Sequence, residues 1–275
     1  MRIRLAHSPD ADDAFMFAGL ATGQVDPGRF RFEHVLEDIQ SLNDRASRGE
    51  MEITAISAHA YAYVRDRYLI TRCGGSFGDG YGPVIISREP IQPAELPKVS
   101  IAIPGTTTSA FLALQLFRPG LKTRLLPFDR ILSAVESGLV ECGLIIHEAQ
   151  VTYEQMGLYC VADLGKWWAQ KTGDLPLPLG LNAIRRDLDP QVRRELETVL
   201  LASIRYALDN REDCVRHAMR YARDLGVEQA DRFIGMYVND LTLDMGERGQ
   251  KALEEFLDRS HQAGITPNAL PLEFA

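Results

Sequence analysis

Groups that could carry chemistry gather in a few short stretches of this 275-residue chain, and the first contains His147 and Glu148. Both follow the apolar run 142–146, which predicts a strand. His147 therefore lies at the carboxyl end of a strand, where the residues that line ligand-binding clefts are commonly found. Imidazole has an ordinary pKa of about 6.5 and accepts a proton at neutral pH. His147 is therefore a candidate general base, although a histidine that only caps the next helix fits the same position. Glu148 suits the first turn of that helix.

A second stretch, Pro104-Gly-Thr-Thr-Thr-Ser-Ala110, lies between an expected strand and a helix expected from residue 107. Several hydroxyls and free backbone N–H groups at a helix N-terminus form a site for an anion, best matched to a carboxylate. A single threonine acting as N-cap explains the pattern equally well. No Gly-Lys-Ser/Thr follows, so the stretch is not a nucleotide-binding P-loop.

The third stretch, His7-Ser-Pro-Asp-Ala-Asp-Asp-Ala-Phe-Met-Phe17, contains three carboxylates in four residues. Such a group could bind a metal ion, since hard cations prefer oxygen ligands. Asp10, Asp12 and Asp13 also fall at the N-cap and first turn of an expected helix, where acids are favoured electrostatically. No calcium loop with its glycine and closing glutamate follows, so the helix interpretation is preferred.

Ser57 directly follows the expected strand 53–56, and His59 lies just beyond it on an expected helix. Its hydroxyl could bind a ligand or cap that helix. No Gly-x-Ser-x-Gly elbow surrounds Ser57, so a nucleophilic serine is not indicated.

Alternating strand and helix patterns must position these groups. Strands are expected at 3–6, 30–35, 53–56, 84–87, 99–103, 123–126, 141–146, 159–162 and 179–184. Helices are expected at 11–21, 39–47, 59–67, 107–117, 130–137 and 164–171, and four more at 189–208, 211–223, 227–238 and 247–263. This alternation predicts an α/β fold built from βαβ units around a largely parallel sheet.

The order of these elements predicts two lobes. Residues 1–86 with 183–275 would form a large discontinuous α/β lobe, and residues 87–182 an inserted smaller α/β lobe. Two strands near 84–87 and 179–184 would cross between them. The Gly-rich stretch 73–83 would let backbone approach a ligand or let the hinge bend. Ligands of such proteins bind in a central cleft between the lobes.

The charge of the chain limits the classes of partner that it can bind. The chain carries 30 Lys and Arg against 38 Asp and Glu, a formal net charge of −8. Nucleic-acid binding needs clustered basic residues, which the sequence lacks, so that partner is excluded. The expected partner is a small anionic substrate bound by local donors.

Neither a metal nor a membrane is expected. The four cysteines show no metal-ligand or disulfide spacing; they are Cys73, Cys142, Cys160 and Cys214. The N-terminus lacks the apolar stretch of a signal peptide, so we expect a cytoplasmic protein without membrane insertion.

Several motifs spread along nearly the whole chain share one resemblance. They are Val35-Leu-Glu-Asp-Ile39 with Leu42-Asn43, Tyr63-Val-Arg-Asp-Arg-Tyr68, Gly74-Gly75 through Gly80-Tyr-Gly-Pro83, Phe128-Asp-Arg-Ile131, Gly143-Leu-Ile-Ile-His-Glu148, Asp163-Leu-Gly with Trp167-Trp168, and Pro176-Leu-Pro-Leu-Gly180. Together they resemble the 1,4-dihydroxy-6-naphthoate synthase family of the futalosine route to menaquinone.

The resemblance implies a fold like that of the type II periplasmic binding proteins and a lyase that uses no metal or organic cofactor. Such enzymes act on cyclic dehypoxanthine futalosine and release 1,4-dihydroxy-6-naphthoate and a three-carbon sugar fragment. The family's general base falls on His147, and its substrate-binding positions fall on Ser57, Thr107 and Thr108. A homodimer is compatible with this assignment. The chain departs from the family's pattern in the turn that carries the three aspartates.

Two other functions remain open. Chorismate dehydratase shares the fold and also serves menaquinone synthesis, although the His-Glu run and the paired tryptophans favour the naphthoate synthase. A solute-binding protein, cytoplasmic or exported, is equally compatible with the fold. The missing signal peptide counts against a solute-binding protein.

Overall fold

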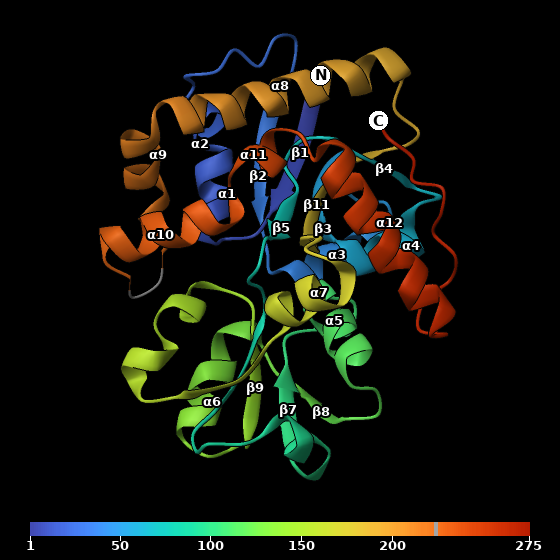
Figure 1. Ribbon diagram of the computed structural model, residues 1–275. Helices are drawn as coiled ribbons and strands as arrows, with labels where there is room; N and C mark the ends of the chain where they lie inside the picture. Colours follow the sequence, from blue (N-terminus) through green and yellow to red (C-terminus); the bar gives the residue numbers. More distant parts are fainter. Residues whose placement is uncertain (223–224) are drawn as a thin grey trace.

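The computed structural model describes residues 1–222 and 225–275, and within them it contains two sheets, one in each of two lobes (Figure 1). The first sheet has the order β2 (Arg31–Leu36), β1 (Arg2–His7), β3 (Ile53–Ser57), β11 (Leu177–Arg185) and β4 (Tyr68–Ile70), and β5 (Ser76–Gly78) pairs with β11. The second has the order β10 (Tyr159–Asp163), β6 (Val84–Ser87), β9 (Cys142–Ile145), β7 (Ser100–Ile103) and β8 (Lys122–Leu125). We name the lobes after these sheets.

Both sheets are mixed, so the expectation of a largely parallel sheet is wrong. Strand β1 pairs in parallel with β2 and β3, and β7 pairs in parallel with β8 and β9, as βαβ units require. Strand β11 is antiparallel to β3, β4 and β5, and β6 is antiparallel to β9 and β10. The antiparallel strands β6 and β11 are those that follow a passage of the chain from one lobe to the other.

Helices cover the sheets. The first lobe carries α1 (Ala11–Met16), α2 (Ala18–Ala21), α3 (Ile39–Ser47), α4 (Ala58–Val64), α8 (Pro190–Asp209), α9 (Arg211–Ala218), α10 (Val227–Tyr237), α11 (Asp240–Leu243) and α12 (Gly246–Gln262). The second carries α5 (Ser109–Phe117), α6 (Ile131–Glu136), α7 (Leu164–Thr172) and the short 3-10 turns η1 (Pro93–Lys98), η2 (Phe128–Arg130), η3 (Glu148–Val151) and η4 (Tyr153–Met156).

Four helices differ from expectation. The helix expected at 59–67 spans Ala58–Val64, and the helix expected from residue 107 begins at Ser109, after the N-cap Thr108. The helix expected at 11–21 is divided at Phe17, which ends α1 and precedes α2. The helix expected over 211–223 ends at Ala218, and Arg223 lies outside the described residues.

Each of the two crossing strands belongs wholly to one sheet, since β6 pairs only within the second and β11 only within the first. The lobe boundaries at 86/87 and 182/183 stay a prediction, because strand pairing does not divide a chain into folding units.

Close backbone contacts surround the segment where the chain first passes from one lobe to the other. A Cβ at Gly165 would collide with the Tyr81 carbonyl, and Leu164 N–H donates to the Pro83 carbonyl at 2.9 Å. Glycine is required at 165 for this backbone contact within the protein.

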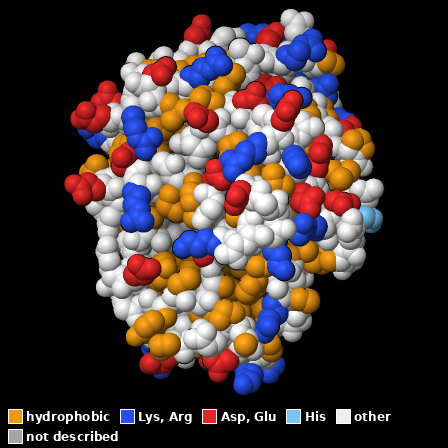
Figure 2. All heavy atoms as spheres, in the orientation of Figure 1, with side chains coloured by type: hydrophobic (Ala, Val, Ile, Leu, Met, Phe, Trp, Pro, Cys, Tyr) orange, Lys and Arg blue, Asp and Glu red, His pale blue; other side chains and the backbone are white. Residues whose placement is uncertain are grey.

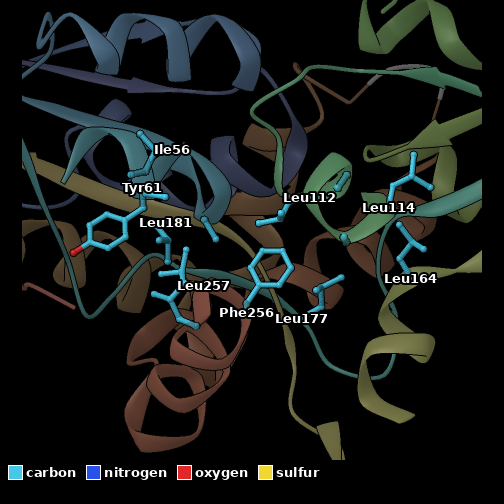
Figure 3. Close-up of a cluster of buried hydrophobic side chains, with 14 of the residues drawn as sticks. Ile56, Tyr61, Leu112, Leu114, Leu164, Leu177, Leu181, Phe256 and Leu257 are labelled. Carbon is cyan, nitrogen blue, oxygen red and sulfur yellow. The ribbon is translucent and has the colours of Figure 1, made fainter. Parts of the chain in front are cut away.

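One apolar core runs through both lobes (Figure 3). It contains Leu112 of α5 and Leu164 of α7 from the second lobe, with Leu181 of β11 and Phe256 of α12 from the first. Trp168 of α7 is fully buried, and its ring meets the Phe256 ring edge-on at 5.4 Å. We call this contact, from Leu112 and Trp168 to Leu181 and Phe256, the apolar seam.

The surface agrees with the charge pattern. On the face shown in Figure 2, basic side chains are interspersed with acidic ones rather than gathered by sign. Among the described residues, no helix is both long and apolar enough to cross a membrane. Three of the four free cysteines are buried, and Cys160 is exposed.

Candidate active site

A cavity lies between the lobes and encloses about 790 Å³ of space, part of it open to solvent. Its described lining comes from both lobes. The polar lining residues are Ser8, Asp10, Asp12, Asp13, Ser57, Ser76, Thr108, Ser109, Gln150, Asn182 and Tyr237. Apolar residues such as Ile39, Ile146, Leu179 and Phe233 complete it. A mostly formed cavity with convergent polar groups is the usual form of a small-molecule site.

Thr108 lines the cavity and also caps α5. Its hydroxyl accepts from Phe111 N–H at 3.2 Å and donates to the Gly105 carbonyl at 3.0 Å. Thr107, its neighbour, is not part of the described lining. Both the N–H and the hydroxyl of Thr107 donate to Gln40 Oε1, at 3.0 and 3.1 Å. Of the two predicted threonine contacts, the structure therefore places only Thr108 at the cavity.

Ser57 lines the cavity at the end of β3, and a buried amide from α3 fixes it. Asn43 Oδ1 accepts from Ser57 N–H at 2.9 Å, and its Nδ2 donates to Ser57 Oγ at 3.0 Å and to the Thr107 carbonyl at 3.2 Å. The Ser57 side chain makes no capping bond to α4. The interpretation of single residues did not identify Asn43 as part of the site. An amide side chain on the apolar face of a predicted helix could have indicated it.

His59 supports the same end of the cavity from behind. It is buried, and its Nδ1 lies 3.2 Å from the Thr108 carbonyl, which accepts only, so Nδ1 carries the proton. Burial lowers the pKa of His59 to about 4. The ring is thus neutral at physiological pH, and it stabilises the backbone of Thr108 without lining the cavity.

Three aspartates also line the cavity. Asp13 Oδ2 accepts from Ser8 N–H at 2.7 Å, and Ser8 Oγ donates to Asp10 Oδ2 at 3.1 Å. Lost solvation and the nearby Asp13, Asp10 and Glu148 carboxylates raise the pKa of Asp12 well above its usual range. Lost solvation also raises the pKa of Asp13, against the opposing effect of its Ser8 bonds.

Asp10, Asp12 and Asp13 stand at the N-cap and in the first turn of α1, as the helix interpretation expects. Asp10 makes no side-chain capping bond there. In the parts of the chain that the structure describes, no group of three or more His, Cys, Asp or Glu side chains could hold a metal ion.

His147, the predicted base, follows β9 and precedes η3. It is 8% exposed, and its ring meets the Phe128 ring edge-on at 5.3 Å. The described lining excludes His147 but includes Ile146 and Gln150 on either side of it in the chain. The structure thus places His147 next to the cavity rather than on its surface.

Around η3 the lobes meet through hydrogen bonds. Glu148, in the first turn of η3 as expected, is buried and accepts from Ala11 N–H at 3.3 Å through Oε1. Gln150 accepts from the Tyr237 hydroxyl of α10. We call these contacts, together with the 3.2 Å bond between exposed Gln155 and Gln229, the polar seam.

Residue reasoning also missed Gln150, Tyr237 and Asn182 as lining residues. They come from η3, α10 and β11, which are far apart in the chain. No local pattern marks them, and only the packing of the two lobes brings them to one cavity.

Comparison with known proteins supplies the family. Residues 3–262 match the family described as menaquinone biosynthesis. A relative from Thermus thermophilus, named 1,4-dihydroxy-6-naphtoate synthase, is 40% identical over 271 residues, which cover 98% of each chain.

Comparison with solved structures supports the same family and shows the fold. A protein from Archaeoglobus fulgidus is 46% identical, with a TM-score of 0.92, over 96% of this chain and 98% of that one. The alkanesulfonate-binding protein of Xanthomonas axonopodis pv. citri is 12% identical, with a TM-score of 0.71, over 98% and 96% of the two chains. At 12% identity the likeness shows only the fold, that of the two-lobed periplasmic binding proteins, which confirms the expected fold class. By the match over residues 3–262, the chain belongs to the menaquinone biosynthesis family.

Proposed function

We propose that this chain is a carbon-carbon lyase that converts cyclic dehypoxanthine futalosine to 1,4-dihydroxy-6-naphthoate and releases a three-carbon sugar fragment. The observation that carries the proposal is the 40% identity, over 98% of both chains, to the Thermus protein named for that product. The substrate, a small anion, would bind in the cavity between the lobes, which buries a ligand on several sides.

In this proposal His147 is the general base. It takes a proton beside the sugar carbons that leave, and formation of the aromatic ring drives the cleavage. His147 directly follows the lining residue Ile146, and closure of the lobes or a shift of the β9–η3 loop would bring its ring to the substrate. The Phe128 ring packs edge-on against the imidazole ring.

Ser57 and Thr108 are assigned to binding the substrate. Both line the cavity, and both are held rigidly, Ser57 by Asn43 and Thr108 by the first turn of α5. Thr107 is assigned to holding the loop, since its polar groups are bonded to Gln40 and Asn43. Polar groups that are already held in place lose little conformational entropy when a ligand binds.

The first test incubates the purified protein with cyclic dehypoxanthine futalosine and follows naphthoate by absorbance and mass. We expect the naphthoate and the three-carbon fragment in equal amounts. Binding without turnover would favour a solute-binding protein, and turnover of chorismate would favour the dehydratase. Either of these outcomes contradicts the proposal.

The second test examines His147. We expect His147→Ala to lower kcat by about 10²- to 10⁴-fold, the range typical of general-base catalysis, while leaving the Kd for 1,4-dihydroxy-6-naphthoate within about threefold. His261→Ala, at an exposed histidine of α12, is the matched control and should retain full activity. Unchanged turnover in His147→Ala would remove the base assignment.

A further inference from the structure

A second cavity lies beside the carboxyl ends of β1 and β2, apart from the one between the lobes. It encloses about 440 Å³ of space, part of it open to solvent. Its described lining includes three histidines, from β1, β2 and α9, and a wall of apolar and aromatic side chains; these are His7, His34, His217, Phe17, Leu36 and Tyr221. Among the described lining residues, none belongs to both cavities. We call this second space the histidine cavity.

Hydrogen bonds decide which ring nitrogens of the first two histidines carry protons. His7 Nδ1 lies 3.0 Å from the Ser8 carbonyl, which accepts only, so Nδ1 carries the proton. Burial lowers the pKa of His7 to about 4, so at pH 7 the ring is neutral and its Nε2 is an acceptor. His34 Nδ1 lies 3.0 Å from that Nε2 and therefore donates to it. Since burial and the nearby His7 and His217 lower the pKa of His34 to about 4, its own Nε2 is also a bare acceptor.

Two ring nitrogens remain available for a ligand. In the described part of the molecule, the buried atoms His34 Nε2 and His217 Nδ1 have no hydrogen-bond partner. A buried polar atom without a partner costs about 1–3 kcal/mol, so a group that supplies one is favoured. His34 Nε2 accepts only, whereas no contact fixes the tautomer of His217, whose Nδ1 either donates or accepts. An occupant of the histidine cavity should therefore carry at least one hydrogen-bond donor.

The walls select a neutral, aromatic occupant. No described lining residue is Asp, Glu, Lys or Arg, and an unpaired charge in such a space is costly. The described residues also lack any group of three or more side chains that could hold a metal ion. The His7 ring lies 4.8 Å from the Phe17 ring, and the His217 ring lies 5.8 Å from the Tyr221 ring. Aromatic side chains stack favourably with a further ring.

We propose that the histidine cavity is a second binding site, for a neutral aromatic compound that carries a hydroxyl group. Its O–H donates to His34 Nε2, and its ring packs beside Phe17 and Tyr221. A phenolic hydroxyl has a pKa of about 10, so it stays uncharged at pH 7 and keeps its proton to donate. The bond from His7 to the Ser8 carbonyl links this site to a lining residue of the cavity between the lobes. The proposal does not depend on the reaction that the larger cavity performs.

Phenol and anisole are the probes that test it. Anisole has a similar shape but no O–H, so the pair isolates the hydrogen bond. The chain has six histidines, and nuclear magnetic resonance of their ring nitrogens follows each one during a titration. We expect phenol to shift the His34 Nε2 resonance saturably, with a Kd on the order of 1 mM for so small a ligand. Anisole should bind about 10-fold more weakly.

Three results would contradict the proposal. If phenol produces no saturable shift of His34, the cavity holds only water. Equal affinities for phenol and anisole would mean that no donor is recognised. Saturation of the His34 and His217 resonances by Zn²⁺ but not by phenol would make the cavity a metal site.

Variants show whether phenol binds in this cavity rather than between the lobes. His34→Phe keeps a ring but removes the acceptor, and it should weaken phenol binding about 10-fold. Ala21→Leu places a larger side chain at the exposed rim of the histidine cavity and should weaken binding by a similar factor without touching the histidines. His261→Ala, at a histidine of α12 outside the described lining, is the matched control and should leave the Kd unchanged.

Thermal denaturation checks the fold of each variant. If His34→Phe does not fold, because His7 loses its donor, Ala21→Leu and the comparison of phenol with anisole still decide the question. Wild-type affinity for phenol in folded His34→Phe and Ala21→Leu would show that phenol binds elsewhere, and the proposal would be wrong.

Discussion

The two seams on either side of the cavity are built from different interactions. At the apolar seam, Trp168 and Phe256 are fully buried and meet edge-on at 5.4 Å within a core that runs through both lobes. At the polar seam, three hydrogen bonds join the lobes, the one between Gln155 and Gln229 is exposed, and partly buried Val151 of η3 packs against the core of the first lobe.

The difference indicates where the molecule can open. Exposing apolar area costs about 25 cal/mol per Å², so separating the apolar seam would expose part of the core to water. A hydrogen bond contributes a net of only about 0.5–1.5 kcal/mol, because its donor and acceptor bond to water once the seam has opened. We therefore expect the lobes to open at the polar seam and to pivot about the apolar one, as in hinged binding proteins.

The largest effect is expected from breaking the apolar seam. Phe256→Ala should lower the free energy of unfolding by about 3–5 kcal/mol, through lost burial and the cavity left behind. Urea denaturation measures the change as a lower midpoint. Val227→Ala, at a side chain 60% exposed, is the control and should change the midpoint little. A loss below about 1 kcal/mol for Phe256→Ala would contradict the tight packing of the two lobes at the apolar seam.

Low pH should destabilise the fold, because protons bind to histidines that are buried in the folded protein. Burial lowers the pKa of His59, beside the apolar seam, and of His7, beside the aspartate turn, to about 4 in each case. The unfolded chain binds these protons near pH 6.5, so stability is highest above that pH and falls as the pH drops from 6.5 to 4. Each fully buried histidine contributes on the order of 3 kcal/mol to that loss.

His59→Asn sharpens the assignment of that loss. The amide replaces the Nδ1 donor to the Thr108 carbonyl but does not titrate. Urea denaturation at several pH values should show a shallower decline below pH 6.5 for the variant than for the wild type. An identical decline would place the acid sensitivity elsewhere.

An intermediate effect is expected at Asn43, which links α3 to Ser57 and to the Thr107 loop. Asn43→Ala should cost about 1–3 kcal/mol, because Ser57 N–H loses a buried partner. It should also raise KM, since Ser57 loses its fixed position at the cavity. Gln40→Ala, which removes the acceptor of Thr107 and an exposed bond to Asp44, should cost less stability. Equal losses in the two variants would argue against a special role for Asn43.

The smallest effect is expected at the polar seam. Tyr237→Phe removes one buried hydrogen bond, to Gln150, and should cost about 1 kcal/mol of stability. It should nevertheless raise amide hydrogen exchange in η3, because opening there becomes easier. Gln229→Ala, at the exposed bond, is the matched control. Faster amide hydrogen exchange in α5 instead of η3 would mean that the lobes open at the apolar seam and pivot about the polar one.

Local patterns predicted local structure well. The helix expected at 39–47 has those bounds, because Asp38 accepts from Gln40 and Ser41 N–H and so fixes its start. Asp189 likewise caps α8 ahead of Pro190. The three-residue strands β4 and β5 were not expected, because such short segments carry no periodicity of their own.

The candidate site was predicted in part. Ser57 and Thr108 line the cavity as expected, whereas Thr107, one residue away, turns to Gln40. No sequence rule separates these two threonines, since both belong to the same hydroxyl-rich turn. His147 stands at the strand end where the pattern places it, but its position beside the cavity depends on how η3 packs.

The sequence alone determined the alternating α/β elements, their caps, the absence of a basic cluster and the likeness to one family, because these depend on residues close together in the chain or on composition. Tertiary structure decided the direction of β6 and β11, the choice between Thr107 and Thr108, and the surroundings of Asp12. Glu148, which helps to raise the pKa of Asp12, is 136 positions away in the chain. Electrostatic and packing interactions act through space, so such contacts become defined only when the two lobes meet.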